Sequence, residues 1–127
     1  MNFLLDTHVL IWYIDGDERL GERVITVIEN KENMVYVSKA SLWEIAIKIS
    51  IGKLGISIPF DDLENLLKVH DFSILDYNFM SLKELITLPF HHSDPFDRLI
   101  ISQAITGDFT IITHDRAFDD YAVTILK

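Results

Sequence analysis

The stretch from His91 to Ala104 constrains the fold most strongly, because it places two carboxylates at the start of an apolar helix. Pro95 suits the first helical position, where its missing N–H would have no partner in any case. Asp94 then occupies the N-cap and Asp97 lies in the first turn. The residues that follow are too apolar for an exposed helix. We therefore expect a buried helix whose acidic end either is a well-made cap or binds a cation.

Composition limits the class of protein. At 127 residues, 49% of them hydrophobic, we expect one domain spanning residues 1–127 with a core that needs no disulfides. The absence of cysteine excludes thiolate metal sites, and we expect a reducing, cytoplasmic location. The start of the chain lacks a basic leader, and no apolar run is long enough for a membrane span. The net charge of −9 opposes nucleic-acid binding by bulk electrostatics, unless metal cancels some of the acids.

Strands and helices are predicted to alternate along the chain. The expected strands cover residues 3–6, 34–38, 72–75 and 109–113, with an edge strand at 122–126. The expected helices cover residues 9–13, 20–28, 41–49, 60–69 and 79–86, and a last one begins at residue 95. This order, without hairpin dipeptides, predicts an α/β fold around a mainly parallel sheet.

Acidic residues follow the predicted strands or open the helices after them. In a parallel sheet these positions gather along one edge, where ligands bind. Each acid also has a structural explanation: Ser41 and Glu44 match a capping box, Asp94 matches an N-cap, and Asp115 matches a cap for residues 116–118. Asp6 differs, because a carboxylate at the end of a central strand loses hydration and has no cationic neighbour in the sequence.

Carboxylates that converge at one edge repel one another, which raises some of their pKa values. Mg²⁺ or Mn²⁺ removes this repulsion, since hard cations take oxygen ligands together with water and substrate phosphate. Such a site activates water for attack on phosphorus. The pattern therefore leaves two interpretations open, a set of separate helix caps or a single divalent-metal site.

Other polar residues near these acids carry weaker signals. His91, His92 and His114 are expected to be ordinary loop histidines, and their roles stay open. Arg98 is expected to steer phosphate or to pair with surface acids. Hydroxyl groups such as that of Thr113 either orient carboxylates or form turns.

Four segments resemble the successive motifs of PIN-domain proteins, with greatest similarity to the VapC-type toxins of bacterial toxin–antitoxin pairs. These segments are Leu4-Leu5-Asp6-Thr7-His8-Val9-Leu10-Ile11-Trp12, Ser41-Leu42-Trp43-Glu44-Ile45-Ala46-Ile47-Lys48, residues 91–104 and Thr113-His114-Asp115. The resemblance covers essentially the whole chain, and Asp-Pro-Phe-Asp-Arg with its apolar tail is its most specific part. It implies a three-layer sandwich, with helices flanking the central sheet.

The resemblance also implies a function. It implies an endoribonuclease dependent on Mg²⁺ or Mn²⁺, with RNA as substrate, a cognate antitoxin, a homodimer and no membrane partner. The implied catalytic and metal-binding acids are Asp6, Glu44, Asp97 and Asp115, with Asp94 as an accessory ligand. Two alternatives remain: a non-catalytic interaction module with the same fold, and a phosphoacceptor receiver-like domain. The receiver is disfavoured, because it needs adjacent acids after the first strand and Asp6 is followed by Thr7.

Overall fold

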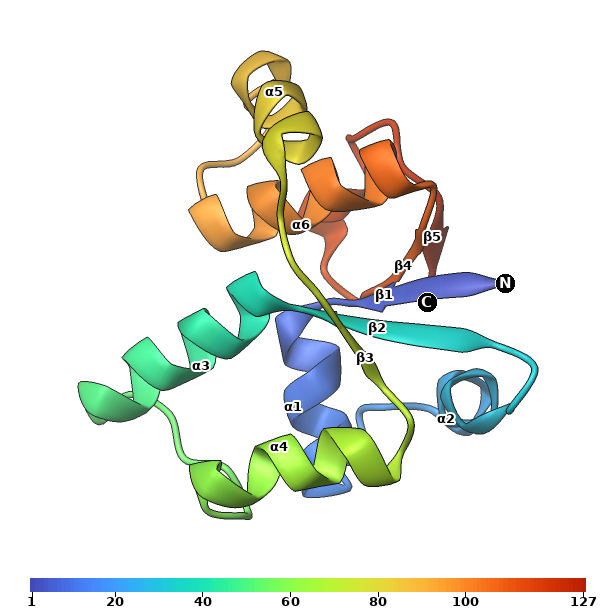
Figure 1. Ribbon diagram of the computed structural model, residues 1–127, viewed down its shortest axis with the longest axis vertical. Helices are drawn as coiled ribbons and strands as arrows, with labels where there is room; N and C mark the ends of the chain where they lie inside the picture. The colour runs from blue at the N-terminus through green and yellow to red at the C-terminus, as the bar shows by residue number, and fades with distance from the viewer.

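Strands and helices alternate along the whole chain in the computed structural model, which describes residues 1–127 (Figure 1). The elements are β1 Asn2–Leu5, α1 Thr7–Asp15, α2 Glu22–Glu29, β2 Met34–Ser38, α3 Lys39–Ser50, α4 Phe60–Val69, β3 Ser73–Leu75, α5 Phe79–Thr87, α6 Pro95–Gly107, β4 Thr110–Ile112, the short 3₁₀ helix η1 Arg116–Phe118 and β5 Ile125–Leu126. The expected alternation is confirmed. No helix combines the length and apolar character needed to cross a membrane.

The five strands form one sheet in the order β3-β2-β1-β4-β5. Every pairing is parallel, so the prediction of a mainly parallel sheet is confirmed. Strand β1 lies at the centre, where Leu4 pairs with Tyr36 of β2 on one side and Ile111 of β4 on the other. The chain therefore builds the sheet outward from β1 in one direction and later returns to extend it in the other.

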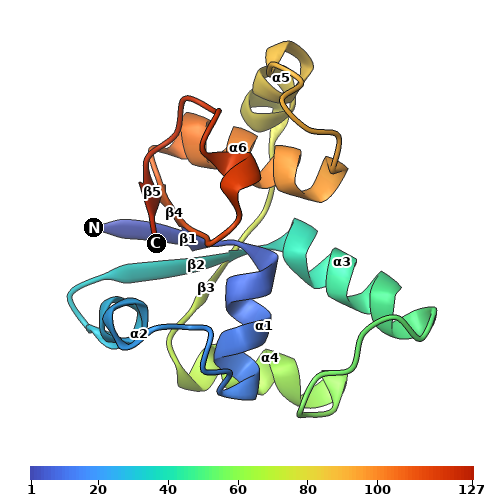
Figure 2. The same cartoon turned by 180° about the vertical axis from the view of Figure 1, so that it is seen from behind.

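Helices cover both faces of the sheet. Phe3 and Leu5 point into a core shared with α1, α2 and α4, whereas Leu4 points into a second core shared with α6. Figures 1 and 2 show α1, α2 and α4 on one side of the sheet and α6 on the other, with α5 outside α6. Strands buried on both faces are apolar without alternation, which explains the uninterrupted Phe-Leu-Leu run of β1.

The structure moves most of the other predicted boundaries by one or two residues; the first strand ends at Leu5 instead of Asp6, and two larger corrections concern α3 and β5. Helix α3 begins at Lys39, because the Ser38 hydroxyl accepts the Ala40 N–H at 3.0 Å and makes Ser38 the N-cap. The predicted capping box of Ser41 and Glu44 is therefore wrong. The edge strand expected at 122–126 shortens to β5, because its two residues pair with only two residues of the short strand β4.

The order of the strands reverses between β1 and β4, since the chain runs from β1 to β2 on one side and reaches β4 on the other. In open parallel sheets, ligands bind beyond the carboxyl ends of the strands at such a reversal. Asp6 follows β1 and Thr113 follows β4 at this edge. The fold thus directs attention to the predicted acids.

Candidate metal centre

Asp6 lies at the carboxyl end of β1 and is almost fully buried, with 1% of its surface exposed. It occupies the N-cap position of α1, yet its side chain makes no capping hydrogen bond. Instead its Oδ2 accepts the hydroxyl of Thr113 at 2.8 Å, which joins the ends of β1 and β4. Its Oδ1 is buried without any hydrogen-bond partner. One oxygen of this carboxylate is thus held, and the other is left open.

Glu44 lies in the second turn of α3 and is 3% exposed. The hydroxyl of the nearby Ser41 accepts that of Thr7 at 2.8 Å, so it does not cap the helix. Lys48, one turn further along α3, donates to Glu44 Oε2 at 2.7 Å. Glu44 Oε1 is buried without a partner. Glu44 therefore repeats the arrangement of Asp6.

Asp94 and Asp97 open α6 as the sequence predicts. Asp94 is the N-cap, and its Oδ1 accepts the backbone N–H groups of Phe96 at 2.9 Å and Asp97 at 3.1 Å. Asp97 is 7% exposed and makes a 3.2 Å contact from Oδ2 to Nε2 of His92. The cap interpretation is therefore confirmed for Asp94, while Asp97 is held by a side chain outside the helix.

Asp115 follows β4 and is exposed. Its Oδ1 accepts the N–H of Ala117 at 2.9 Å, so it caps η1 as predicted. Its own backbone N–H donates at 3.0 Å to the hydroxyl of Thr113, which also holds Asp6. An open hollow of about 210 Å³, lined by Asp6, His8, Trp12, His114 and Asp115, adjoins these two carboxylates.

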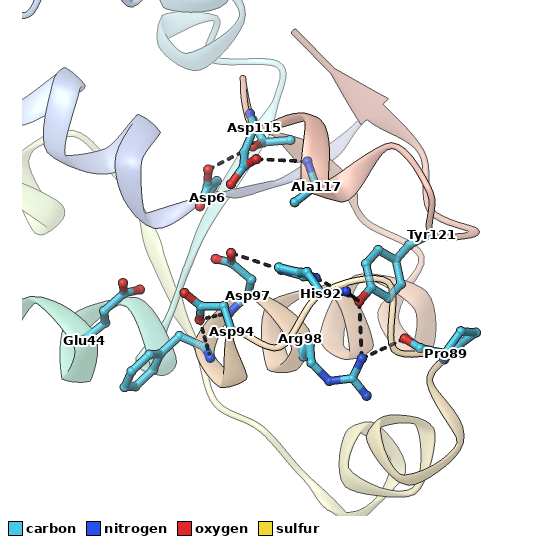
Figure 3. A network of polar contacts seen from close by, with 12 residues as sticks. Asp6, Glu44, Pro89, His92, Asp94, Asp97, Arg98, Asp115, Ala117 and Tyr121 are labelled. Atoms are coloured by element: carbon cyan, nitrogen blue, oxygen red, sulfur yellow. Dashed lines mark hydrogen bonds and ion pairs between the residues drawn. The ribbon is translucent and has the colours of Figure 1, made fainter.

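One feature is common to all five predicted acids: the protein binds one carboxylate oxygen and leaves the other without a partner. In Figure 3, Asp6, Asp94, Asp97 and Asp115 gather around one space, and Glu44 lies to one side of it on α3. The two orphaned oxygens of Asp6 and Glu44 are the only buried side-chain polar atoms in the molecule that lack a partner. A buried carboxylate oxygen without a partner is costly, and bound cations are a common solution.

The acids also share one electrostatic field. Burial, followed by the charges of Asp6, Asp94, Glu44 and Asp115, raises the pKa of Asp97 from 3.8 to about 8. Burial also raises the pKa of Asp6, although the Thr113 hydrogen bond opposes this change. The expectation that converging carboxylates raise some of their pKa values is confirmed for Asp97, where the neighbouring charges add to the effect of burial. At neutral pH the site therefore favours binding a proton or another cation.

The donor set suits a hard divalent ion, since each ligand atom on offer is a carboxylate oxygen. As the side chains stand, no three acidic or histidine residues are close enough to bind one ion directly. The test of fit is therefore the pair of orphaned oxygens, which a cation or its bound water would satisfy.

Arg98 behaves differently from either expectation. It is 4% exposed and forms no ion pair with an acid. Its guanidinium donates to the carbonyl oxygens of Leu88 at 3.0 Å and Pro89 at 2.7 Å and to the hydroxyl of Tyr121 at 3.2 Å. Arg98 is thus a structural cation beneath the site. The prediction that it steers phosphate or pairs with surface acids is wrong, because Leu88, Pro89 and Tyr121 enclose its guanidinium.

Sequence reasoning missed Lys48, which contacts the acid Glu44, and Tyr121, which contacts the acid Asp97 only through His92. Lys48 had no assigned partner, although its i,i+4 spacing from Glu44 on a helix is a recognisable signal. Tyr121 lies in an irregular segment 24 residues beyond Asp97, and nothing in the sequence connects it with His92. Only the folded chain brings them together.

Comparisons with known proteins agree with this fold. A family model for the PIN domain matches residues 3–123. The chain therefore belongs to the PIN-domain family. A search of curated proteins gives no significant match. The receiver-like alternative is wrong, because the family match covers nearly the whole chain.

Several solved structures have a similar fold, among them a toxin–antitoxin complex from Klebsiella pneumoniae. VapBC2 from Rickettsia felis, bound to a promoter DNA fragment, matches with a TM-score of 0.73 at 18% identity, covering 99% of this chain and 98% of that one. FitAcB from Neisseria gonorrhoeae matches with a TM-score of 0.65 at 19% identity, covering 98% and 96%. VapBC-1 from nontypeable Haemophilus influenzae matches with a TM-score of 0.65 at 16% identity, covering 100% and 98%. At these identities the similarity establishes the shared fold.

Proposed function

We propose that this protein is a metal-dependent endoribonuclease and the toxin of a toxin–antitoxin pair. The observation that carries the proposal is the pair of buried, unpartnered oxygens on Asp6 and Glu44 within a group of five carboxylates. A purely structural site would leave neither oxygen without a partner, because an unsatisfied buried carboxylate destabilises the fold. Membership of the PIN-domain family supports nuclease chemistry at this edge of the sheet.

The five acids and the residues that contact them would have different roles in the proposed reaction. Asp6, Glu44 and Asp97 are the proposed main ligands of Mg²⁺ or Mn²⁺, directly or through water, and Asp94 is an accessory ligand. Asp115 completes a second metal position or orients the attacking water. When bound, the metal supplies positive charge to the phosphodiester and activates water. The carboxylates fix the place of that charge, and Thr113, Lys48 and His92 hold them in orientation.

A bound divalent ion also resolves the problem of charge. The protein carries a net charge of −9, which repels RNA. Among the lysines and arginines, only Lys48 forms an ion pair with an acid of the site. Metal at the carboxylates would supply the local attraction for phosphate that the surface lacks.

Partners follow from the same proposal. One of the similar structures is a toxin–antitoxin complex from Klebsiella pneumoniae, which supports a cognate antitoxin for this chain. A homodimer is supported by exposed apolar side chains on and near α5, where Phe79, Ile86 and Phe90 are each at least 80% exposed. We also propose that residues 1–127 act as one domain.

The test is RNA cleavage by the purified protein in Mg²⁺ or Mn²⁺, with EDTA as the metal-free condition. We expect cleavage that EDTA and Asp6→Asn each abolish. Asp120→Asn is the matched control, because it removes the same charge from an exposed residue. Cleavage that survives both EDTA and Asp6→Asn would contradict the proposal. If the protein shows no cleavage and metal does not stabilise it, the result would favour the non-catalytic interaction module.

A further inference from the structure

A chain of polar contacts runs from Asp97 through the partly buried His92 to the buried Tyr121 and Arg98 (Figure 3). His92 Nε2 lies 3.2 Å from Asp97 Oδ2, and His92 Nδ1 lies 2.8 Å from the hydroxyl of Tyr121. Tyr121 is 5% exposed, and its hydroxyl also contacts the guanidinium of the buried Arg98. Three residues without a carboxylate thus form one continuous support behind Asp97.

The direction of each hydrogen bond follows from the donors present. The Tyr121 hydroxyl oxygen accepts Arg98 Nη1 at 3.2 Å and the backbone N–H of His92 at 3.3 Å. With both acceptor positions used, the hydroxyl proton is left for the 2.8 Å contact to His92 Nδ1. Nδ1 is then an acceptor, so the neutral imidazole carries its proton on Nε2. That proton points at Asp97 Oδ2.

Arg98 determines this direction, because a guanidinium has donors only. It is fixed by the carbonyl oxygens of Leu88 and Pro89, and its charged carbon lies 3.7 Å from the centre of the Phe90 ring. A hydroxyl facing this group cannot donate to it. The buried arginine therefore selects the tautomer of His92 through Tyr121.

We propose that Tyr121 and His92 are positioning residues, which hold Asp97 Oδ2 so that only Oδ1 faces the proposed metal. The inference rests on the proposed function and assigns residues outside the five acids to it. Partners of this kind orient metal ligands elsewhere, and their loss lowers metal affinity by about 10- to 100-fold. The same one-oxygen arrangement at Asp6, through Thr113, and at Glu44, through Lys48, fits a site that uses each carboxylate singly.

The first experiment measures the tautomer directly, by ¹⁵N NMR of the metal-free protein with labelled histidine. We expect His92 to carry its proton on Nε2 in the wild type and to populate both tautomers in Tyr121→Phe. Tyr36→Phe is the matched control, because Tyr36 packs against the same core as Tyr121 but is not among the hydrogen-bond partners of His92, so this change should leave His92 unchanged. A wild-type His92 protonated on Nδ1 would overturn the inference, whatever the protein's activity.

The second experiment measures Mn²⁺ affinity by calorimetry at one pH. Tyr121→Phe should weaken binding about 10-fold, and Tyr36→Phe should leave it unchanged. His92→Gln places an amide donor near the Nε2 position and should retain more affinity than His92→Leu. If the wild type binds Mn²⁺ and Tyr121→Phe binds it with equal affinity, the positioning role would be overturned. Wild type that does not bind Mn²⁺ would instead count against the proposed function, with the NMR result still deciding the tautomer.

Discussion

The strongest physical consequence of the site is a dependence of stability on pH in the absence of metal. The carboxyl of Asp97 has its pKa raised from 3.8 to about 8 by burial and by four neighbouring carboxylates. Between these two values the folded protein retains a proton that the unfolded chain releases. The free energy of unfolding must therefore fall as the pH rises from about 4 to about 8 and level off above that.

The size of the effect follows from the same values. A pKa of about 8 lies three units above pH 5, and each unit is worth about 1.4 kcal/mol, so the decrease from pH 5 to pH 8.5 has an upper limit of about 4 kcal/mol. Relaxation of the carboxylates toward water raises the effective dielectric constant, so we expect about 2 kcal/mol. This is a large share of the total for a domain of this length.

The assay is urea unfolding followed by far-UV circular dichroism at pH 5 and pH 8.5, with EDTA present. Asp97→Asn should lose most of the pH dependence and should be more stable than the wild type at pH 8.5. Asp120→Asn, which changes the same charge on the surface, should keep the wild-type slope. Equal stability of the wild type at the two pH values, or an unchanged slope in Asp97→Asn, would refute the electrostatic reasoning.

Three further perturbations have defined outcomes. Mn²⁺ at a hundredfold excess over its dissociation constant should stabilise the wild type by about 2.7 kcal/mol in thermal unfolding. Glu44→Gln should abolish most of that gain. An equal gain in the variant would exclude Glu44 as a ligand. Thr113→Val removes the donor to Asp6 and should weaken Mn²⁺ binding about 10-fold by calorimetry; unchanged affinity would contradict a role in orientation. Gly107→Ala should lower the free energy of unfolding by about 1–3 kcal/mol in urea, because the added Cβ would overlap the Phe109 ring. Gly55→Ala is the control, since a Cβ there meets nothing within 4 Å. Equal effects of the two changes would contradict the close packing of Gly107 against Phe109.

Elements with a strong periodic signal could be predicted from the sequence. The helix expected at 60–69 and the strand expected at 34–38 match α4 and β2 residue for residue. The start of α3 could not be placed, because Ser38 and Ser41 are both good caps in isolation. The choice depends on Thr7, whose hydroxyl donates to the buried Ser41 from a helix that is distant in the sequence. Tertiary contacts therefore decided that boundary.

The acids of the site could be found because the topology of a parallel sheet brings strand ends together. Their supports could not be found in the same way. Thr113 was one hydroxyl among several at strand ends, and Tyr121 comes from a segment without periodicity. Arg98 had the sequence context of a surface residue, but in the fold Leu88, Pro89 and Tyr121 enclose its guanidinium. Contacts that depend on side-chain direction in irregular segments have no sequence signature.

Helix caps and metal ligands looked like competing explanations of the same acids, but a carboxylate has two oxygens. Asp94 and Asp115 each cap a helical segment with one oxygen and keep the other free. The residues that distinguish the two explanations are the two acids that do not cap a helix. Asp6 occupies the N-cap position of α1, but its side chain makes no capping hydrogen bond, and Glu44 lies within α3. These same two residues carry the only buried, unpartnered oxygens of the molecule. A buried acid that caps no helix is not explained by secondary structure, and the proposed cation would satisfy the free oxygen of each of these two residues.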